Sequence, residues 1–233
     1  MNHSIIIALD DDNLTRIEQL IEQIPVENYK LKVGKEMFTR FGPNFVKRLV
    51  NKGFDVFLDL KFHDIPNTVA RACKAAADLG VWMINVHALG GMNMLSAARE
   101  ALNQYGNNKP LLIAVTLLTS FDQRQLSQIG LQEPIHKVIG RLALLSARAQ
   151  LDGIVCSAQD IADIKSQLPS EFLYITPGIR LSTSQSDDQK RIMTPADALN
   201  AGASYLVIGR PITQAESPLD VLEKIQLDIN TRL

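Results

Sequence analysis

Short apolar segments rich in β-branched residues alternate with longer amphipathic segments along the whole chain. Residues 4–10, SIIIALD, are typical of a buried strand, and the apolar side chains of residues 13–24 recur at the spacing of one helix face. The same alternation predicts strands within residues 29–35, 55–62, 81–89, 110–119, 152–158, 172–180 and 205–210. It predicts helices within residues 43–53, 66–80, 94–102, 134–150, 159–168, 194–202 and 218–229.

Eight strands that alternate with helices predict a parallel sheet, because parallel neighbours need a crossover connection. Eight such units within 233 residues favour a closed (β/α)8 TIM barrel over an open, doubly wound sheet. No GxGxxG motif follows a predicted strand, which argues against a dinucleotide-binding fold. No linker divides the chain, so we predict one barrel domain over residues 1–233. The polar stretch at residues 181–193 is expected to form a lid.

The overall charge and composition argue against several classes of protein. A net charge of −1 and a pI of about 6.4 give no general attraction to nucleic acid or to an anionic membrane. No apolar run reaches the ~18 residues of a transmembrane helix, and the N-terminus lacks the basic start of a signal peptide. Cys73 and Cys156 form no CxxC motif. We therefore expect a cytoplasmic protein that binds neither nucleic acid nor membranes.

Charged side chains gather near the ends of the first three predicted strands. In the third strand, Asp59 and Lys61 share a face with Phe57, whereas the opposite face is apolar and must pack on helices. Functional groups of such barrels lie at the carboxyl ends of the strands, so both charges should face the barrel mouth. Lys32 follows the same alternation, and Asp10 ends the first strand. Because buried charges are costly unless paired, we interpret these four as a functional cluster, although single charges at strand ends can also be solvated.

The end of the last predicted strand indicates an anion site. Gly209 and Arg210 end this strand, and strands seven and eight of such barrels commonly bind phosphate through backbone N–H groups and a helix N-terminus. The guanidinium group of Arg210 could add two charge-assisted hydrogen bonds. The alternative is a surface arginine beside a turn glycine.

The histidines do not indicate a metal site. The four of them show no ligand spacing such as HExxH, and no GxSxG motif supports a nucleophilic serine. His63 and His87 lie where the third and fourth predicted strands end. We interpret them as hydrogen-bonding supports rather than as ligands, and we expect no metal.

The segment DLKFHDIPNTV, residues 59–69, resembles the signature of the orotidine 5′-phosphate decarboxylase family. The pieces IIIALD, LKVGKEMF, VHALGG, VTLLTS, TPGIR, DDQKR and VIGRPIT follow the family's order over essentially the whole chain. The resemblance implies a (β/α)8 barrel, a homodimer, and conversion of orotidine 5′-phosphate to UMP and CO₂ with no metal or organic cofactor. One departure is Leu89, where many relatives have serine; it touches none of the site positions below.

The resemblance also implies roles for individual residues. Lys61 matches the lysine that delivers a proton to C6. Lys32, Asp59 and Asp64 match the rest of a charged array in which Asp64 comes from the partner subunit. The positions that match substrate contacts are Asp10 and Lys32 at the ribose, Thr68 from the partner, Thr119 at the pyrimidine, and Arg180, Gln189, Gly209 and Arg210 on the phosphate side.

Two other interpretations remain open at this point. Related barrels that decarboxylate or synthesise sugar phosphates with magnesium also carry Asp-x-Lys-x-x-Asp, which DLKFHD satisfies. The IPNT continuation and the LLTS segment argue against them. A non-catalytic nucleotide-binding barrel could retain the same pocket, but the intact Lys61 argues against that.

Overall fold

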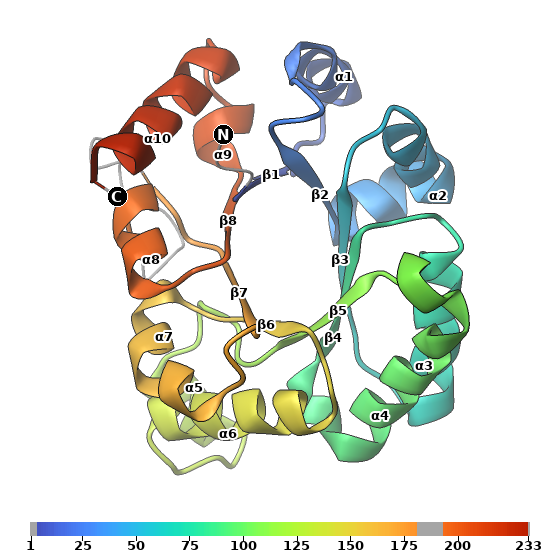
Figure 1. Ribbon diagram of the computed structural model, residues 1–233, viewed down its shortest axis with the longest axis vertical. Helices are drawn as coiled ribbons and strands as arrows, with labels where there is room; N and C mark the ends of the chain where they lie inside the picture. The colour runs from blue at the N-terminus through green and yellow to red at the C-terminus, as the bar shows by residue number, and fades with distance from the viewer. Residues whose placement is uncertain (1–3, 181–192, 233) are drawn as a thin grey trace.

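The eight predicted strands form a closed parallel barrel (Figure 1). The computed structural model describes residues 4–180 and 193–232. The strands pair in chain order, and β8 closes the ring on β1, with Leu206 opposite Ile5. This confirms the predicted (β/α)8 TIM barrel. The strands are β1 (Ile5–Ala8), β2 (Lys30–Gly34), β3 (Val56–Phe62), β4 (Met83–His87), β5 (Leu111–Val115), β6 (Gly153–Val155), β7 (Leu173–Thr176) and β8 (Tyr205–Ile208).

Helices surround the barrel and occupy every predicted helical segment. The α-helices are α1 (Leu14–Gln23), α2 (Lys35–Asn51), α3 (Pro66–Ala77), α4 (Gly91–Leu102), α5 (Gln123–Gln128), α6 (Ile135–Arg148), α7 (Ala158–Ile164), α8 (Pro195–Ala201), α9 (Arg210–Thr213) and α10 (Pro218–Arg232). Short 3₁₀ turns are η1 (Ala88–Gly90), η2 (Asn103–Asn108) and η3 (Lys165–Gln167). None of these helices in the described ranges is long and apolar enough to cross a membrane.

Two features of the helices differ from the sequence prediction. Helix α2 begins at Lys35 rather than near Pro43. Gly42 (φ 66°) kinks this helix, and the sequence predicts only the second piece, which begins at Pro43. The sequence pattern does not predict α5 and α9. Helix α5 buries only Leu126, so it carries no amphipathic stripe that a sequence pattern could reveal.

Alternation along the strands divides the apolar core into two layers. One set of side chains packs between the strands and the helices, and the opposite set fills the barrel interior. In β3, for example, Leu58 faces the helices and Phe57 faces the interior. The interior layer consists of Ile6, Ala8, Phe57, Met83, Ile113, Val115, Val155, Ile175 and Val207.

A cation–aromatic cluster closes the amino-terminal end of the barrel. The Nζ of Lys30, the first residue of β2, lies 4.5 Å from the ring centre of Trp82 and 2.5 Å from Oδ2 of Asp55. Trp82 packs edge-on against Tyr205, with ring centres 5.1 Å apart. Lys30 and Lys32 point to the same side of β2, but their side chains lie at opposite ends of the barrel. Of the two, only Lys32 lines the cavity at the carboxyl-terminal end.

Candidate active site

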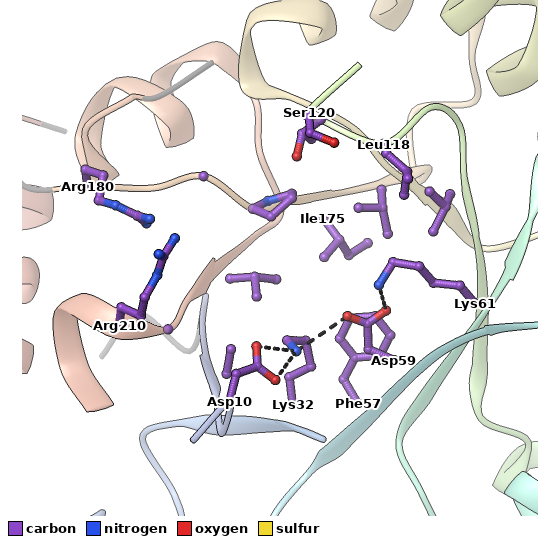
Figure 2. A pocket seen from close by; sticks show the side chains of 18 of the residues that line it. Asp10, Lys32, Phe57, Asp59, Lys61, Leu118, Ser120, Ile175, Arg180 and Arg210 are labelled. Atoms are coloured by element: carbon purple, nitrogen blue, oxygen red, sulfur yellow. Dashed lines mark hydrogen bonds and ion pairs between the residues drawn. The ribbon is translucent and has the colours of Figure 1, made fainter. Parts of the chain in front are cut away.

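A cavity of about 480 Å³ opens at the carboxyl ends of the strands (Figure 2). Its floor is the last layer of the barrel interior, formed by Ala8, Phe57, Val115, Val155, Ile175 and Val207. The cavity therefore lies where the packed interior ends and the loops after the strands begin. Eight of the residues predicted for the site line it: Asp10, Lys32, Asp59, Lys61, Thr119, Arg180, Gly209 and Arg210.

One side of the cavity carries four side chains of alternating charge, which we call the charged chain (Figure 2). The Nζ of Lys32 lies 3.1 and 3.0 Å from the two carboxylate oxygens of Asp10 and 3.5 Å from Oδ2 of Asp59. The other carboxylate oxygen of Asp59 accepts a hydrogen bond of 2.6 Å from the Nζ of Lys61. Three neighbouring strands thus bring together the four charges that the sequence places near their ends, in the order Asp10, Lys32, Asp59, Lys61.

Lys32 and Asp59, the two central charges, are each held in the ionised form by their neighbours. Burial lowers the pKa of Lys32, but the carboxylates of Asp59 and Asp10 outweigh burial and raise this pKa above its ordinary value. Burial raises the pKa of Asp59, but the ammonium groups of Lys32 and Lys61 outweigh it and hold this pKa below its ordinary value. Asp59 is therefore a carboxylate at neutral pH although its side chain is only 12% exposed.

A glycine makes room for the first ion pair. A Cβ atom at Gly34, the last residue of β2, would lie 2.7 Å from Oδ1 of Asp10 and 3.0 Å from the Nζ of Lys32. The first of these distances is shorter than any ordinary carbon–oxygen contact. The close approach of Asp10 to Lys32 therefore requires the absence of a side chain at this position.

The end of β3 departs from regular strand geometry at Lys61. Its φ of 54° lies in the left-handed region, which costs a non-glycine residue about 1–3 kcal/mol. Strand β3 pairs with β4 at Leu58–Ile84 and next at Phe62–Val86, so four steps along β3 face two along β4. Asp59 and Lys61 both line the cavity, but a bulge, rather than the predicted regular alternation, brings Lys61 there.

The opposite side of the cavity carries two guanidinium groups. Figure 2 shows Arg180 and Arg210 projecting towards each other, across the cavity from Lys61. Arg180 is 8% exposed and donates a hydrogen bond of 2.9 Å to the carbonyl of Ile179. Arg210 is the first residue of α9, directly after Gly209. Such a cavity suits a ligand whose anionic group lies far from the atom that faces the lysines.

Two predicted residues, Asp64 and Thr68, do not line the cavity of this protein, and a third cannot be placed. Asp64 is exposed in the turn before α3, where its carboxylate accepts a hydrogen bond of 2.6 Å from the backbone N–H of Ile65. Thr68 lies in the first turn of α3, away from the cavity. Gln189, and the expected lid except Met193, fall outside the described residues.

Two histidines lie beside the charged chain. The rings of His63 and His87 stack with centres 5.4 Å apart. Burial, followed by the positive charges of His63, Lys61 and Lys35, lowers the pKa of His87 to about 4, so this ring is neutral at pH 7. Its buried Nδ1 has no hydrogen-bond partner among the described residues, so the expected supporting hydrogen bond is not seen at this atom. In the same ranges no group of three or more His, Cys, Asp or Glu side chains could hold a metal ion.

Sequence reasoning misses three residues with polar side chains at or near the cavity. Ser120 and Gln214 line it, but they follow β5 and α9 in loops whose course no periodicity predicts. Asn85 lies beneath it and hydrogen-bonds to both Asp59 and Lys61. A polar residue inside the apolar strand MINVH was the signal that could have revealed Asn85.

Comparisons with known proteins agree with this geometry. Residues 3–225 match the model of the Orotidine 5′-phosphate decarboxylase / HUMPS family. The chain belongs to this family. It is 58% identical to the orotidine 5′-phosphate decarboxylase of Tolumonas auensis over 226 residues, 97% of each chain, and 58% identical to that of Pseudoalteromonas atlantica over 225 residues, again 97% of each.

A solved structure of a family member has the same barrel. The crystal structure of orotidine 5′-phosphate decarboxylase from Lactobacillus acidophilus is 35% identical to this chain and superimposes with a TM-score of 0.86. The match covers 98% of this chain and 99% of the other. The likeness to the family thus extends over the whole barrel, including every strand that contributes to the cavity.

Proposed function

We propose that this protein decarboxylates orotidine 5′-phosphate to UMP and CO₂ without a cofactor, the final step of de novo pyrimidine nucleotide synthesis. The observation that carries the proposal is that the cavity of this family member has two charged ends. The side chains of Asp10, Lys32, Asp59 and Lys61 lie at one end, and those of Arg180 and Arg210 lie at the other. The substrate has matching ends, a carboxylated pyrimidine and a 5′-phosphate.

The chemistry explains why a lysine must stand at the reacting carbon. Loss of CO₂ from C6 leaves a carbanion whose electrons lie in the plane of the ring, so the ring π system delocalises them poorly. With no cofactor as an electron sink, the protein must lower the barrier by roughly 20 kcal/mol or more. In this proposal the ammonium of Lys61 stabilises the negative charge at C6 and then donates the proton that replaces CO₂.

Asp59 and Lys32 orient this proton donor. The 2.6 Å hydrogen bond between Asp59 and the Nζ of Lys61 fixes the direction of the ammonium, and Lys32 anchors the other oxygen of Asp59. Asp59 would also lie near the substrate carboxylate, and the repulsion between them disappears as CO₂ leaves. Asp10, which pairs with Lys32, is proposed to bind the ribose, and Thr119, which lines the cavity, is proposed to bind the pyrimidine.

The phosphate end contributes to rate as well as to affinity. Arg180, Gly209 and Arg210 are proposed to bind the 5′-phosphate, together with Gln189 from the lid. Because the phosphate is far from C6, its binding energy can drive closure of the lid and removal of water from the reacting centre.

The protein is further proposed to act as a homodimer with shared active sites. Asp64 and Thr68 would then complete the cavity of the partner subunit. Exposed apolar side chains near the loops after β3, β4 and β5 support an interface on this face: Ile65 is 67% exposed, Leu89 40%, Met92 36% and Leu118 39%. A two-fold contact through this face would complete both sites together.

Loss of the substrate's ultraviolet absorbance with EDTA present tests the proposal. The wild-type protein should convert orotidine 5′-phosphate to UMP at the same rate with and without the chelator. Activity that needs added magnesium would favour the sugar-phosphate alternative. Binding of UMP without any turnover would favour a non-catalytic nucleotide-binding barrel.

A further inference from the structure

We propose that Asn85 is the positioning residue that holds Lys61 in its reactive geometry; this inference rests on the proposed function. Asn85 lies in β4 and is completely buried. It is the residue between the two pairs that flank the bulge of β3, Leu58–Ile84 and Phe62–Val86. Its side chain therefore lies where the hydrogen-bond ladder between the two strands is interrupted.

The side-chain amide of Asn85 bonds to the two residues of the bulge that carry charge. Its Oδ1 accepts a hydrogen bond of 2.7 Å from the backbone N–H of Lys61, and its Nδ2 donates one of 2.6 Å to Oδ1 of Asp59. A backbone N–H can only donate and a carboxylate can only accept, so this orientation of the amide is the one that satisfies both partners. An aliphatic side chain of similar size could make neither bond.

These two bonds position the ammonium of Lys61 in two ways, through the backbone of Lys61 and through the carboxylate that accepts from its Nζ. The bond to the backbone N–H supports the left-handed φ of 54°, which the chain would otherwise avoid. The bond to Asp59 reaches the same oxygen that accepts from the Nζ of Lys61 at 2.6 Å. Asn85 thus fixes both the base of the lysine side chain and the acceptor that orients its tip, without itself lining the cavity.

A purely structural role explains these observations less well. The other side chains of β4 up to Val86 are apolar, and an apolar residue at position 85 would avoid the cost of burying an amide. Buried polar groups are retained where they specify one geometry, and here both specified partners belong to the charged chain.

Asn85→Leu, which has a similar shape, tests this role. With orotidine 5′-phosphate, kcat should fall about 100-fold, the loss expected when a reacting group is displaced by about 1 Å. The KM and the affinity for UMP should change little, because the phosphate side is untouched, and the thermal midpoint shows whether the variant is folded. Ser146→Ala is the matched control: it removes a buried side-chain hydrogen bond in α6, from Ser146 Oγ to the carbonyl of Leu142, and should leave kcat unchanged.

Asn85→Asp gives a second readout that does not depend on the folding of the leucine variant. When protonated, the introduced carboxyl can donate to Asp59 and accept from the N–H of Lys61, as the amide does; when ionised, it repels Asp59. The ratio of variant to wild-type kcat should therefore fall as the pH rises. Parallel pH profiles for Asn85→Asp and the wild type, or a loss in kcat below about tenfold for a folded Asn85→Leu, would overturn the role of Asn85. Absence of turnover by the wild type would instead overturn the proposed function.

Discussion

The Nζ of Lys61 lies 2.6 Å from Oδ1 of Asp59, although the two residues are not related by the regular pleat of one strand. The bulge of β3 turns Lys61 into the cavity, and its left-handed backbone keeps it there. Asp59 in turn contacts Lys32, which contacts Asp10. Lys61, at the end of this series of contacts, is thus held by a carboxylate and still faces the cavity that a substrate would fill.

Removal of Arg210 should affect a phosphorylated substrate far more than the bare nucleoside. Arg210→Ala should lower kcat/KM for orotidine 5′-phosphate roughly 10–100-fold, the usual effect of losing charge-assisted hydrogen bonds. Steady-state kinetics on orotidine should change little, since it has no phosphate to bind. Arg148→Ala, on the exposed surface of α6, is the control. An equal fractional loss on both substrates would remove Arg210 from the phosphate site.

A methyl group at Gly34 should disturb the first ion pair without unfolding the barrel. Gly34→Ala places a carbon against Asp10 and Lys32, so kcat/KM should fall by roughly 10–100-fold. Gly140→Ala is the control, because its added carbon would approach no atom outside its own helix more closely than 3.7 Å. That change should keep full activity and stabilise α6 by about 0.5–1 kcal/mol. Unchanged kinetics in Gly34→Ala would show that the spacing of Asp10 and Lys32 is not critical.

His87 should make the folded protein less stable in mild acid. Its pKa is about 4 in the folded state and near 6.5 when unfolded, so only the unfolded chain takes up a proton here between these values. The stability that comes from a neutral His87 is therefore complete above pH 6.5 and is lost as the pH falls towards 4. Urea unfolding at several pH values should show a shallower acid slope for His87→Gln than for the wild type.

Replacement of the exposed His136 in α6 provides the control for this slope. His136→Gln should leave the pH dependence close to that of the wild type. Identical slopes in His87→Gln and the wild type would mean that the ring of His87 does not stay neutral in the fold.

Hybrid dimers can test whether the active sites are shared between subunits. Lys61→Ala and Asp64→Asn chains, unfolded and refolded together, should pair at random, so that half of the dimers are hybrids. If Asp64 serves the partner's Lys61, one site of each hybrid carries both changes and the other neither. Activity should then return to about a quarter of the wild-type value. No recovery, in a mixture that mass measurement shows to contain hybrids, would contradict a shared site.

The barrel and one half of its charged chain could be predicted from sequence because both follow local periodicity. The alternation of apolar residues defines each strand and its two faces, and Lys32 and Asp59 lie where the pleat places them. The end of β3 could not be predicted in the same way. The bulge at Lys61 depends on how β3 pairs with β4, which are more than twenty residues apart in the chain, and on the amide of Asn85.

Other parts of the site were beyond sequence reasoning for a similar reason. Helix α9 has four residues and no amphipathic pattern, so nothing local predicts that Gln214, directly after it, reaches the cavity. The approach of Arg180 to Arg210 depends on the pairing of β7 with β8, the strands that precede these two residues. Local pattern thus predicts which elements form, whereas the pairing between them determines how these side chains meet.

The most direct test of the account follows the hydrogen at C6 of the product. Wild-type protein with orotidine 5′-phosphate, EDTA and D₂O should yield equal amounts of CO₂ and of UMP with one deuterium at C6, measured by mass spectrometry and NMR. Lys61→Ala should remain folded but lose at least about 100-fold in kcat, the range expected for a lost proton donor. Lys47→Ala, on the exposed face of α2, should keep full activity. Wild-type turnover that requires a metal ion, or a folded Lys61→Ala variant that loses less than this, would contradict cofactor-free decarboxylation by Lys61.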